Sequence, residues 1–205
     1  MTVRFHRHDL PNLDNYAVEA VAIDTETLGL VPRRDRLCVV QLSPGDGTAD
    51  VVQIAAGQTD APNLVRLLSD PAVTKIYHYA RFDLAVLYNA FGVTQDSVFC
   101  TKVASRLTRT YTDRHGLKDI CLELLGVGLS KVQQSSDWAA ETLTQDQLDY
   151  AASDVLYLHR LREVLTMRLA RDGRTEMAEA CFRFLPTRAR LDLLGWEEAD
   201  IFAHS

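Results

Sequence analysis

The strongest constraint on the fold of this chain is the order of its hydrophobic patterns. Apolar, β-compatible segments dominate the first part of the sequence, and helical periodicity dominates from residue 101 onward. The expected strands are residues 18–27, 37–42, 50–54 and 74–77, and the expected helices before residue 101 are 63–68 and 81–91. Three early strands, a fourth strand after a helix, and then helices predict a mixed sheet flanked by helices, an α/β fold.

The second half of the chain carries clear helix signals. Thr144 followed by Gln147 is a capping box, and no Pro or Gly interrupts the pattern from there to residue 170, so we expect one helix over this stretch. Residues 126–139 before it show low periodicity and are expected to form a loop. A last helix is expected from Glu176 to about Phe184, ending before Pro186. We expect one domain, residues 1–205, with a helical C-terminal tail from about residue 174.

Composition narrows the class of protein. The chain has 205 residues with 47% hydrophobic residues, which is typical of a globular domain that forms its core without disulfides or a structural metal. Its 22 Lys and Arg against 28 Asp and Glu give a net charge of −6, which argues against binding long nucleic acid by charge alone. The four cysteines are widely spaced, and neither a membrane-length apolar stretch nor a signal peptide is present. We therefore expect a soluble, cytoplasmic protein with no membrane partner.

Two acids end the most apolar segment of the chain. Asp24 and Glu26 lie two residues apart, so in extended backbone both side chains leave the same face. Such a triplet is common by itself, and the alternative to a functional role is that the two acids lie at a strand end that turns to solvent. Its position after a buried strand favours a binding site, because α/β sheets bind ligands at the carboxyl ends of their strands.

Two further acids lie on predicted helices. Asp83 lies in the first turn of a helix after the strand 74–77, where the alternative role is a favourable interaction with the helix dipole. Tyr150 and Asp154 lie four apart, hence on one helix face, where the alternative is a core tyrosine and a solvated aspartate.

These four carboxylates, brought together, predict a site for Mg²⁺ or Mn²⁺, because hard divalent cations prefer carboxylate oxygens and water. Two such ions hold both the attacking and the leaving oxygen of an in-line displacement at phosphorus. A phenol at Tyr150 suits a group that orients the attacking water, since its ordinary pKa near 10 makes it a poor base.

The order of these motifs resembles a known group of enzymes. D-x-E at 24–26, H-x-x-x-x-D at 78–83 and Y-x-x-x-D at 150–154 resemble the DEDD superfamily of 3′–5′ exonucleases, in the subgroup with Tyr in the third motif (DEDDy). Residues 131–161, with their Ser-Asp-Trp triplet, are similar to ribonuclease D. The resemblance implies a ribonuclease H-like, DnaQ-like fold with a mixed five-stranded sheet.

A nearer likeness extends from the FHRHDLPNLDNY opening to the C-terminal GWEEADIFAHS, and it is to the nano-RNase C family. The resemblance implies a stand-alone enzyme that degrades very short RNA, particularly dinucleotides, and assembles as a homo-octamer. It also implies that Asp24, Glu26, Asp83 and Asp154 hold two divalent cations, Mg²⁺ or Mn²⁺, and that Tyr150 orients water.

The resemblance suggests substrate contacts as well. Leu30 stands at the position where related oligoribonucleases insert an apolar side chain between the two bases, and the alternative is ordinary core packing. His78 lies near the scissile phosphate or closes the strand. A basic stretch offers donors for a cap on the 5′ phosphate, some of them acting from a neighbouring subunit, with a solvated helix face as the alternative: Lys102, Ser105, Arg106, Arg109, Arg114 and His115. Gln134, Ser136, Asp137 and Trp138 form a second substrate-side element, in which Trp138 has core anchoring as its alternative.

The leading hypothesis is therefore a metal-dependent 3′–5′ exoribonuclease that hydrolyses very short RNA to 5′-mononucleotides. The enzyme alternatives are ribonuclease D-like trimming of the 3′ ends of longer RNA and exonuclease activity on DNA. A third alternative is an RNA-binding module without activity. The presence of all four acids and Tyr150 argues against it, because binding alone does not require mutually repelling carboxylates.

Overall fold

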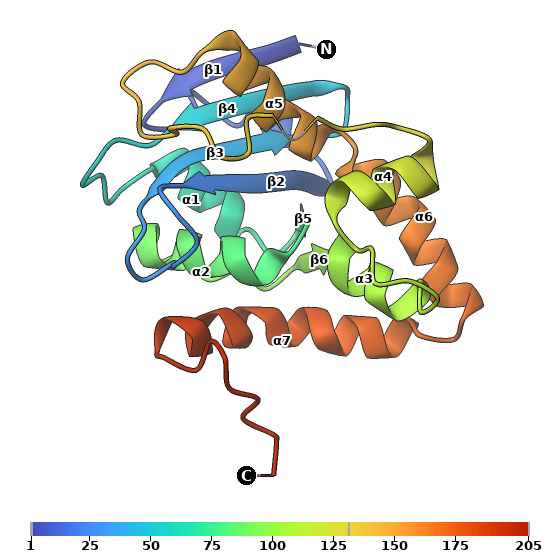
Figure 1. The fold of residues 1–205 in the computed structure, drawn as a ribbon. Coiled ribbons are helices and arrows are strands. Elements are labelled where there is room, and N and C mark those ends of the chain that lie inside the picture. The colour runs from blue at the N-terminus through green and yellow to red at the C-terminus, as the bar shows by residue number, and fades with distance from the viewer. Residues whose placement is uncertain (1, 131, 205) are drawn as a thin grey trace.

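The computed structural model of the protein describes residues 2–130 and 132–204, so residues 1, 131 and 205 lie outside it. Its centre is one mixed six-stranded sheet in the order β1-β4-β3-β2-β5-β6 (Figure 1). The strands are β1 (Thr2–Arg7), β2 (Ala20–Thr27), β3 (Leu37–Ser43), β4 (Thr48–Gln53), β5 (Thr74–Tyr77) and β6 (Val98–Cys100). The predicted α/β class with a mixed sheet is confirmed.

Strands β2, β3 and β4 form an antiparallel meander, as the turn-rich segments between them predict. Strands β5 and β6 then add in parallel beside β2, while β1 pairs in parallel with β4 at the other edge. Strand β2 therefore lies inside the sheet, and its carboxyl end meets that of β5.

The predicted number of five strands was wrong. Strand β1 lies at the edge of the sheet, and all of its residues are exposed or partly exposed. Its sequence therefore lacks the apolar run that marks a buried strand. Strand β6 has only three residues, all buried, which is too short for a periodic pattern.

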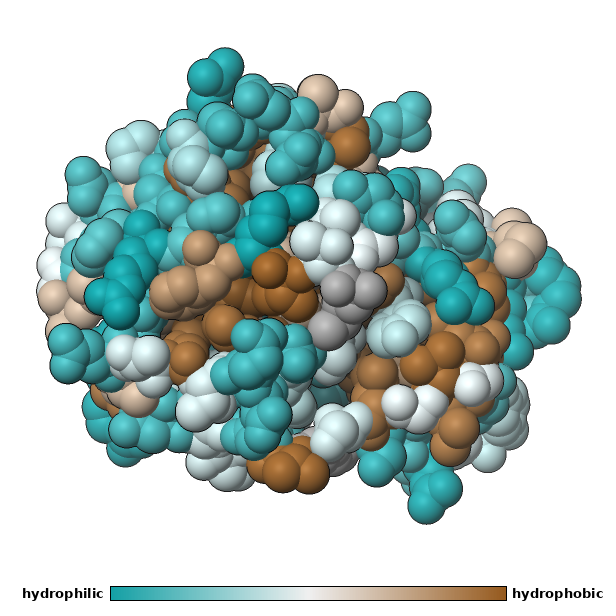
Figure 2. All heavy atoms as spheres, turned by 90° about the horizontal axis from the view of Figure 1, so that it is seen from above, coloured by the Kyte–Doolittle hydropathy of each residue, from teal (hydrophilic) through white to brown (hydrophobic). Residues whose placement is uncertain are grey.

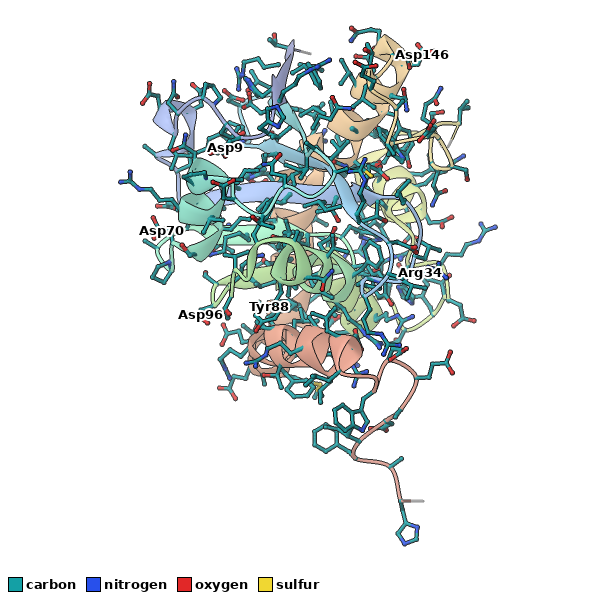
Figure 3. All side chains as sticks on the ribbon, turned by 90° about the vertical axis from the view of Figure 1, so that its left-hand side faces the viewer. Asp9, Arg34, Asp70, Tyr88, Asp96 and Asp146 are labelled. Carbon is teal, nitrogen blue, oxygen red and sulfur yellow. The ribbon has the colours of Figure 1, made fainter. Side chains whose placement is uncertain are left out.

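Helices cover both faces of the sheet. They are α1 (Pro62–Ser69), α2 (Ala80–Phe91), α3 (Thr101–Thr108), α4 (Leu117–Leu125), α5 (Gln145–Leu156), α6 (Leu158–Arg171) and α7 (Thr175–Leu193), with a 3-10 turn at Asp14–Tyr16. Helix α5 packs across β1 to β4 on one face, and α2 and α7 lie on the other. Figure 3 shows this separation, with Asp146 of α5 above the sheet and Tyr88 of α2 below it. From the α5 side the molecule is largely hydrophilic, with hydrophobic side chains gathered in two areas (Figure 2).

The single helix predicted up to residue 170 is in fact two helices. Thr144 caps α5 with the predicted capping box, but the chain turns at Tyr157 and α6 continues in a new direction. The turn lets α5 lie on the sheet while α6 packs against α3 and α4. Neither Gly nor Pro marks it, because packing rather than local preference imposes the break.

The C-terminal helix is also longer than predicted. Helix α7 continues through Pro186 to Leu193, because the buried side chains Leu185 and Ala189 pack against the body before and after the proline. The segment after α7 then leaves the body of the molecule (Figures 1 and 3). None of the helices in the described part of the chain is long and apolar enough to cross a membrane.

Candidate active site

Three of the four predicted acids meet at the carboxyl end of β2. Asp24 and Glu26 point from β2 toward α5, which carries Asp154, and one carboxylate oxygen of each lies within 4.8 Å of the others. Tyr150 lies one turn before Asp154 on the same helix. Helix α5 reaches this position because two alanines, Ala151 and Ala152, let it approach closely and are themselves fully buried.

The fourth acid reaches the site from the other face of the sheet. Asp83 lies in the first turn of α2, is 2% exposed and accepts a 2.7 Å hydrogen bond from the Thr25 hydroxyl. Thr25 lies between Asp24 and Glu26 on β2, so strand alternation directs its side chain toward α2. Strand β2 thus supplies Asp24 and Glu26 on one face of the sheet, and on the other face its Thr25 holds Asp83 by a hydrogen bond.

Burial raises the pKa values of all four carboxyl groups, and repulsion from neighbouring acids adds to it at Asp24 and Glu26. Burial is the main cause throughout, and it raises the pKa of Asp83 to about 7 and that of Asp154 to about 7. The charges of Asp154 and Asp83 add to burial at Glu26 and bring its pKa to about 9. The pKa of Asp24 lies well above its ordinary value for the same two reasons. Such a cluster favours protons or cations, and an all-oxygen donor set fits a hard divalent cation.

A buried carboxylate elsewhere in the sheet shows the contrast. Asp50 on β4 accepts hydrogen bonds from the Arg4 guanidinium at 2.8 Å and the Tyr16 hydroxyl at 2.7 Å. Although burial raises the pKa of Asp50, these bonds outweigh it and hold the pKa below its usual range. Arg4 therefore neutralises the structural acid Asp50, whereas no Lys or Arg among residues 2–130 and 132–204 forms an ion pair with the four-acid cluster.

Tyr150 keeps its proton at neutral pH. Burial, followed by the charges of Asp154, Glu26 and Asp24, raises the pKa of its phenol well above the ordinary value. Its ring lies 6.0 Å from that of Trp138, centroid to centroid, and Trp138 is 2% exposed in a small core cluster with Cys38, Val39, Val51, Leu143 and Ala151. The contacts of Trp138 therefore favour its alternative role as a core anchor, and its ring packs beside that of Tyr150.

The acids open into a cavity of about 290 Å³. Three of the predicted substrate-side residues line it, namely His78, Lys102 and Gln134. The other side chains around it are Thr25, Tyr79, Leu117, Lys118, Leu129 and Ser130, with Gly116 between them. Leu30, Ser105, Arg106, Arg109, Arg114, His115 and Trp138 are not among the lining residues.

The comparisons agree with this geometry. The sequence profile of a 3′-5′ exonuclease family matches residues 11–170. The chain belongs to the 3′–5′ exonuclease family. Among solved structures, it is similar to Brucella melitensis NrnC with bound Mg²⁺, with 74% identity, complete coverage of both chains and a TM-score of 0.97. The same Brucella protein bound to pGG matches with 75% identity and a TM-score of 0.98.

More distant relatives carry the ribonuclease D name. Ribonuclease D of Granulibacter bethesdensis is 36% identical over 154 residues, which are 75% of this exonuclease and 38% of that protein. The Escherichia coli RNase D structure matches with 29% identity and a TM-score of 0.76, covering 86% of this chain and 46% of that one. The chain spans about two fifths of the length of the curated relatives it matches.

Within this exonuclease, part of the predicted basic stretch is engaged in internal bonds. Arg109 is fully buried, and its guanidinium donates to the Glu123 carboxylate, to the Arg114 carbonyl and to the Ser105 hydroxyl. Ser105 also bonds His115 Nδ1 at 2.9 Å. These contacts hold the loop between α3 and α4 in place, whereas Arg106 and Arg114 are exposed.

His78 and Tyr79 also line the cavity. The Nδ1 atom of His78 lies 2.9 Å from the Thr101 hydroxyl, and burial lowers the pKa of its imidazole to about 3, so the ring is neutral at physiological pH. Tyr79 follows in a left-handed backbone conformation with φ 74°, and the Lys102 ammonium lies 4.2 Å from its ring centroid. Sequence reasoning missed Tyr79 and Thr25, because neither the backbone conformation nor the proximity to Asp83 leaves a signal in the sequence.

Proposed function

We propose that this exonuclease hydrolyses the 3′-terminal phosphodiester of very short RNA, dinucleotides in particular, to give 5′-mononucleotides. The observation that carries the proposal is the uncompensated four-acid cluster, of which Asp24, Glu26 and Asp154 line a cavity of about 290 Å³, near the lower end of the size range of small-ligand sites. The similar Brucella protein bound to pGG supports a substrate of this class.

Asp24, Glu26, Asp83 and Asp154 would hold two divalent cations, Mg²⁺ or Mn²⁺. When bound, these ions lower the pKa of water and stabilise the charge that develops on the phosphate oxygens. Tyr150, protonated at neutral pH, donates its hydroxyl proton in a hydrogen bond that orients the attacking water. The water oxygen would bond to phosphorus and lose one proton as the bond from phosphorus to the upstream 3′ oxygen breaks. That 3′ oxygen would gain one proton, so that one water is added across the phosphodiester.

The remaining predicted residues take supporting roles in this proposal. Lys102 and Gln134, which line the cavity, bind the substrate backbone, and neutral His78 forms a hydrogen bond near the scissile phosphate. Leu30, which is 85% exposed in the loop after β2, inserts between the two bases. Exposed Arg106 and Arg114 bind the 5′ phosphate, while Ser105, Arg109 and His115 hold the loop that presents Arg114.

For assembly, we infer a cytoplasmic homo-octamer, as in the nano-RNase C family that the chain resembles. Exposed apolar side chains on the segment after α7, Trp196, Ile201 and Phe202, support a self-associating protein. Light scattering on the purified protein tests this, since an octamer has eight times the 23.0 kDa mass of the chain and a monomer would contradict the inference.

The second candidate function is stepwise trimming of longer RNA, which the ribonuclease D relatives favour. Rates on 5′-labelled RNAs of two, three, seven and twenty nucleotides separate the two, with Asp24→Ala as the inactive control. We expect the dinucleotide to be cleaved much faster than the others. Equal or faster shortening of the twenty-mer would overturn the preference for dinucleotides, and cleavage of matched DNA would broaden the substrate class.

A further inference from the structure

Gln41 is a fully buried glutamine in contact with the acid cluster. It lies on β3 directly opposite Asp24 of β2, so the two side chains share one face of the sheet. Its Nε2 atom donates a 2.6 Å hydrogen bond to Asp24 Oδ2. This bond holds one oxygen of the carboxylate that Asp24 contributes to the cluster with Glu26 and Asp154.

The chemistry of this donor differs from that at Asp50. A guanidinium and a phenol bind Asp50 and remove its need for any further cation. An amide carries no net charge, so Gln41 restricts the rotation of Asp24 without cancelling the charge that would attract a metal ion. The same sheet therefore holds one carboxylate by neutralising it and another by orienting it.

The amide of Gln41 is only partly satisfied. Its Oε1 atom is buried and has no hydrogen-bond partner among the described residues. Turning the amide over would place Oε1 against the Asp24 carboxylate, so the observed orientation is the one that the charge allows. A buried polar atom without a partner costs stability, and an apolar side chain would avoid that cost. The bond to Asp24 is thus the feature that accounts for a glutamine here.

We propose that Gln41 is a positioning residue that orients Asp24 for divalent-cation binding. The proposal rests on the proposed function of the four-acid cluster. It assigns Gln41 no contact with RNA, so its effect passes through Asp24 to the metal ion. Groups that orient the ligands of a metal ion typically change metal affinity or activity by about 10- to 100-fold when they are removed.

The test compares Gln41→Met with Gln95→Met in the full chain. Gln95 is a matched control because it is also buried, accepts one 2.6 Å hydrogen bond from the Tyr77 hydroxyl and leaves its Nε2 atom without a partner among the described residues. It does not line the cavity of the acids. Both variants lose one side-chain hydrogen bond of a buried glutamine, so they separate positioning of Asp24 from general packing.

We expect Gln41→Met to raise the Kd for Mg²⁺ about 10- to 100-fold by calorimetry and to reduce the Mg²⁺-dependent rise in melting temperature. At limiting Mg²⁺ its kcat falls, while KM for a dinucleotide at saturating Mg²⁺ stays within twofold. Gln95→Met should keep the wild-type Kd.

A Kd within twofold of wild type for Gln41→Met, or equal weakening in Gln95→Met, would overturn the proposal. If the wild-type protein binds Mg²⁺ but does not hydrolyse dinucleotides, the proposed substrate is wrong, and the Mg²⁺ titrations still decide the role of Gln41.

Discussion

At the scale of single residues, the site is defined by charges that the fold leaves uncompensated. Burial raises the pKa values of Asp24, Glu26, Asp83 and Asp154, and Asp83 and Asp154 raise those of Asp24 and Glu26 further. No Lys or Arg of the described chain forms an ion pair with any of the four. Holding such groups together costs folding free energy, and a bound cation offsets it. Without a bound cation, the four acids therefore lower the stability of the fold.

One consequence is an unusual pH dependence of the metal-free protein. The pKa of Glu26 rises to about 9 and the pKa values of Asp83 and Asp154 to about 7, all above the unfolded values near 4. Between pH 5 and 9 the folded state thus binds more protons than the unfolded state, so stability falls as pH rises. Melting temperatures in a chelator should decrease across this window, and Glu26→Gln should flatten the decrease. An increase across the window would contradict the assignment.

A second prediction concerns Tyr150. Tyr150→Phe removes the hydroxyl but keeps the ring against Trp138, so the fold is preserved. We expect kcat on a dinucleotide to fall about 100-fold, the lower end of the range for groups that assist proton transfer, with an unchanged Kd for Mg²⁺. A variant with wild-type kcat would remove Tyr150 from the mechanism.

At the scale of elements, the start of α2 is tied to the end of α7. Arg81, two residues before Asp83, donates two hydrogen bonds to the Asp192 carboxylate at 2.5 and 2.7 Å, and Arg188 donates a third at 2.6 Å. Asp192 is 8% exposed. The C-terminal helix thereby fixes the turn that carries Asp83, so an element without a residue in the site contributes to its geometry.

Asp192→Ala tests this link. The change leaves two guanidinium groups without their acceptor, so we expect a loss of about 2 kcal/mol of unfolding free energy and a fall in kcat. Glu197→Ala is the matched control, because the Arg33–Glu197 pair is solvent-exposed and is worth less than about 1 kcal/mol. Denaturant unfolding measures both, and equal losses in the two variants would show that Asp192 has no special role.

At the scale of the whole molecule, the chain has a net charge of −6, but two lysines, Lys102 and Lys118, line the cavity. This distribution suits a small anion held at a few points rather than a long polymer gripped along its backbone. Each phosphate that is neutralised in a single strand contributes a slope of about −0.7 to the salt dependence of binding.

We therefore expect the binding of a 5′-phosphorylated dinucleotide to an inactive Asp24→Ala variant to show a slope between about −0.7 and −1.4 in log affinity against log salt. Fluorescence anisotropy over a series of salt concentrations measures it, with a twenty-mer as the comparison. A much steeper slope for the twenty-mer, together with tighter binding, would favour the trimming function.

The sequence by itself determined the α/β class, the meander and the start of α5, and it singled out the four acids and Tyr150 as site candidates. Local signals specify these features, because strand alternation, a capping box and motif spacing act over a few residues. Only the tertiary structure decided that Asp83 arrives from the opposite face, that Gln41 and Thr25 fix two acids, and that Arg109 is an internal anchor. These contacts join residues up to 58 positions apart, and packing between elements rather than sequence pattern selects them.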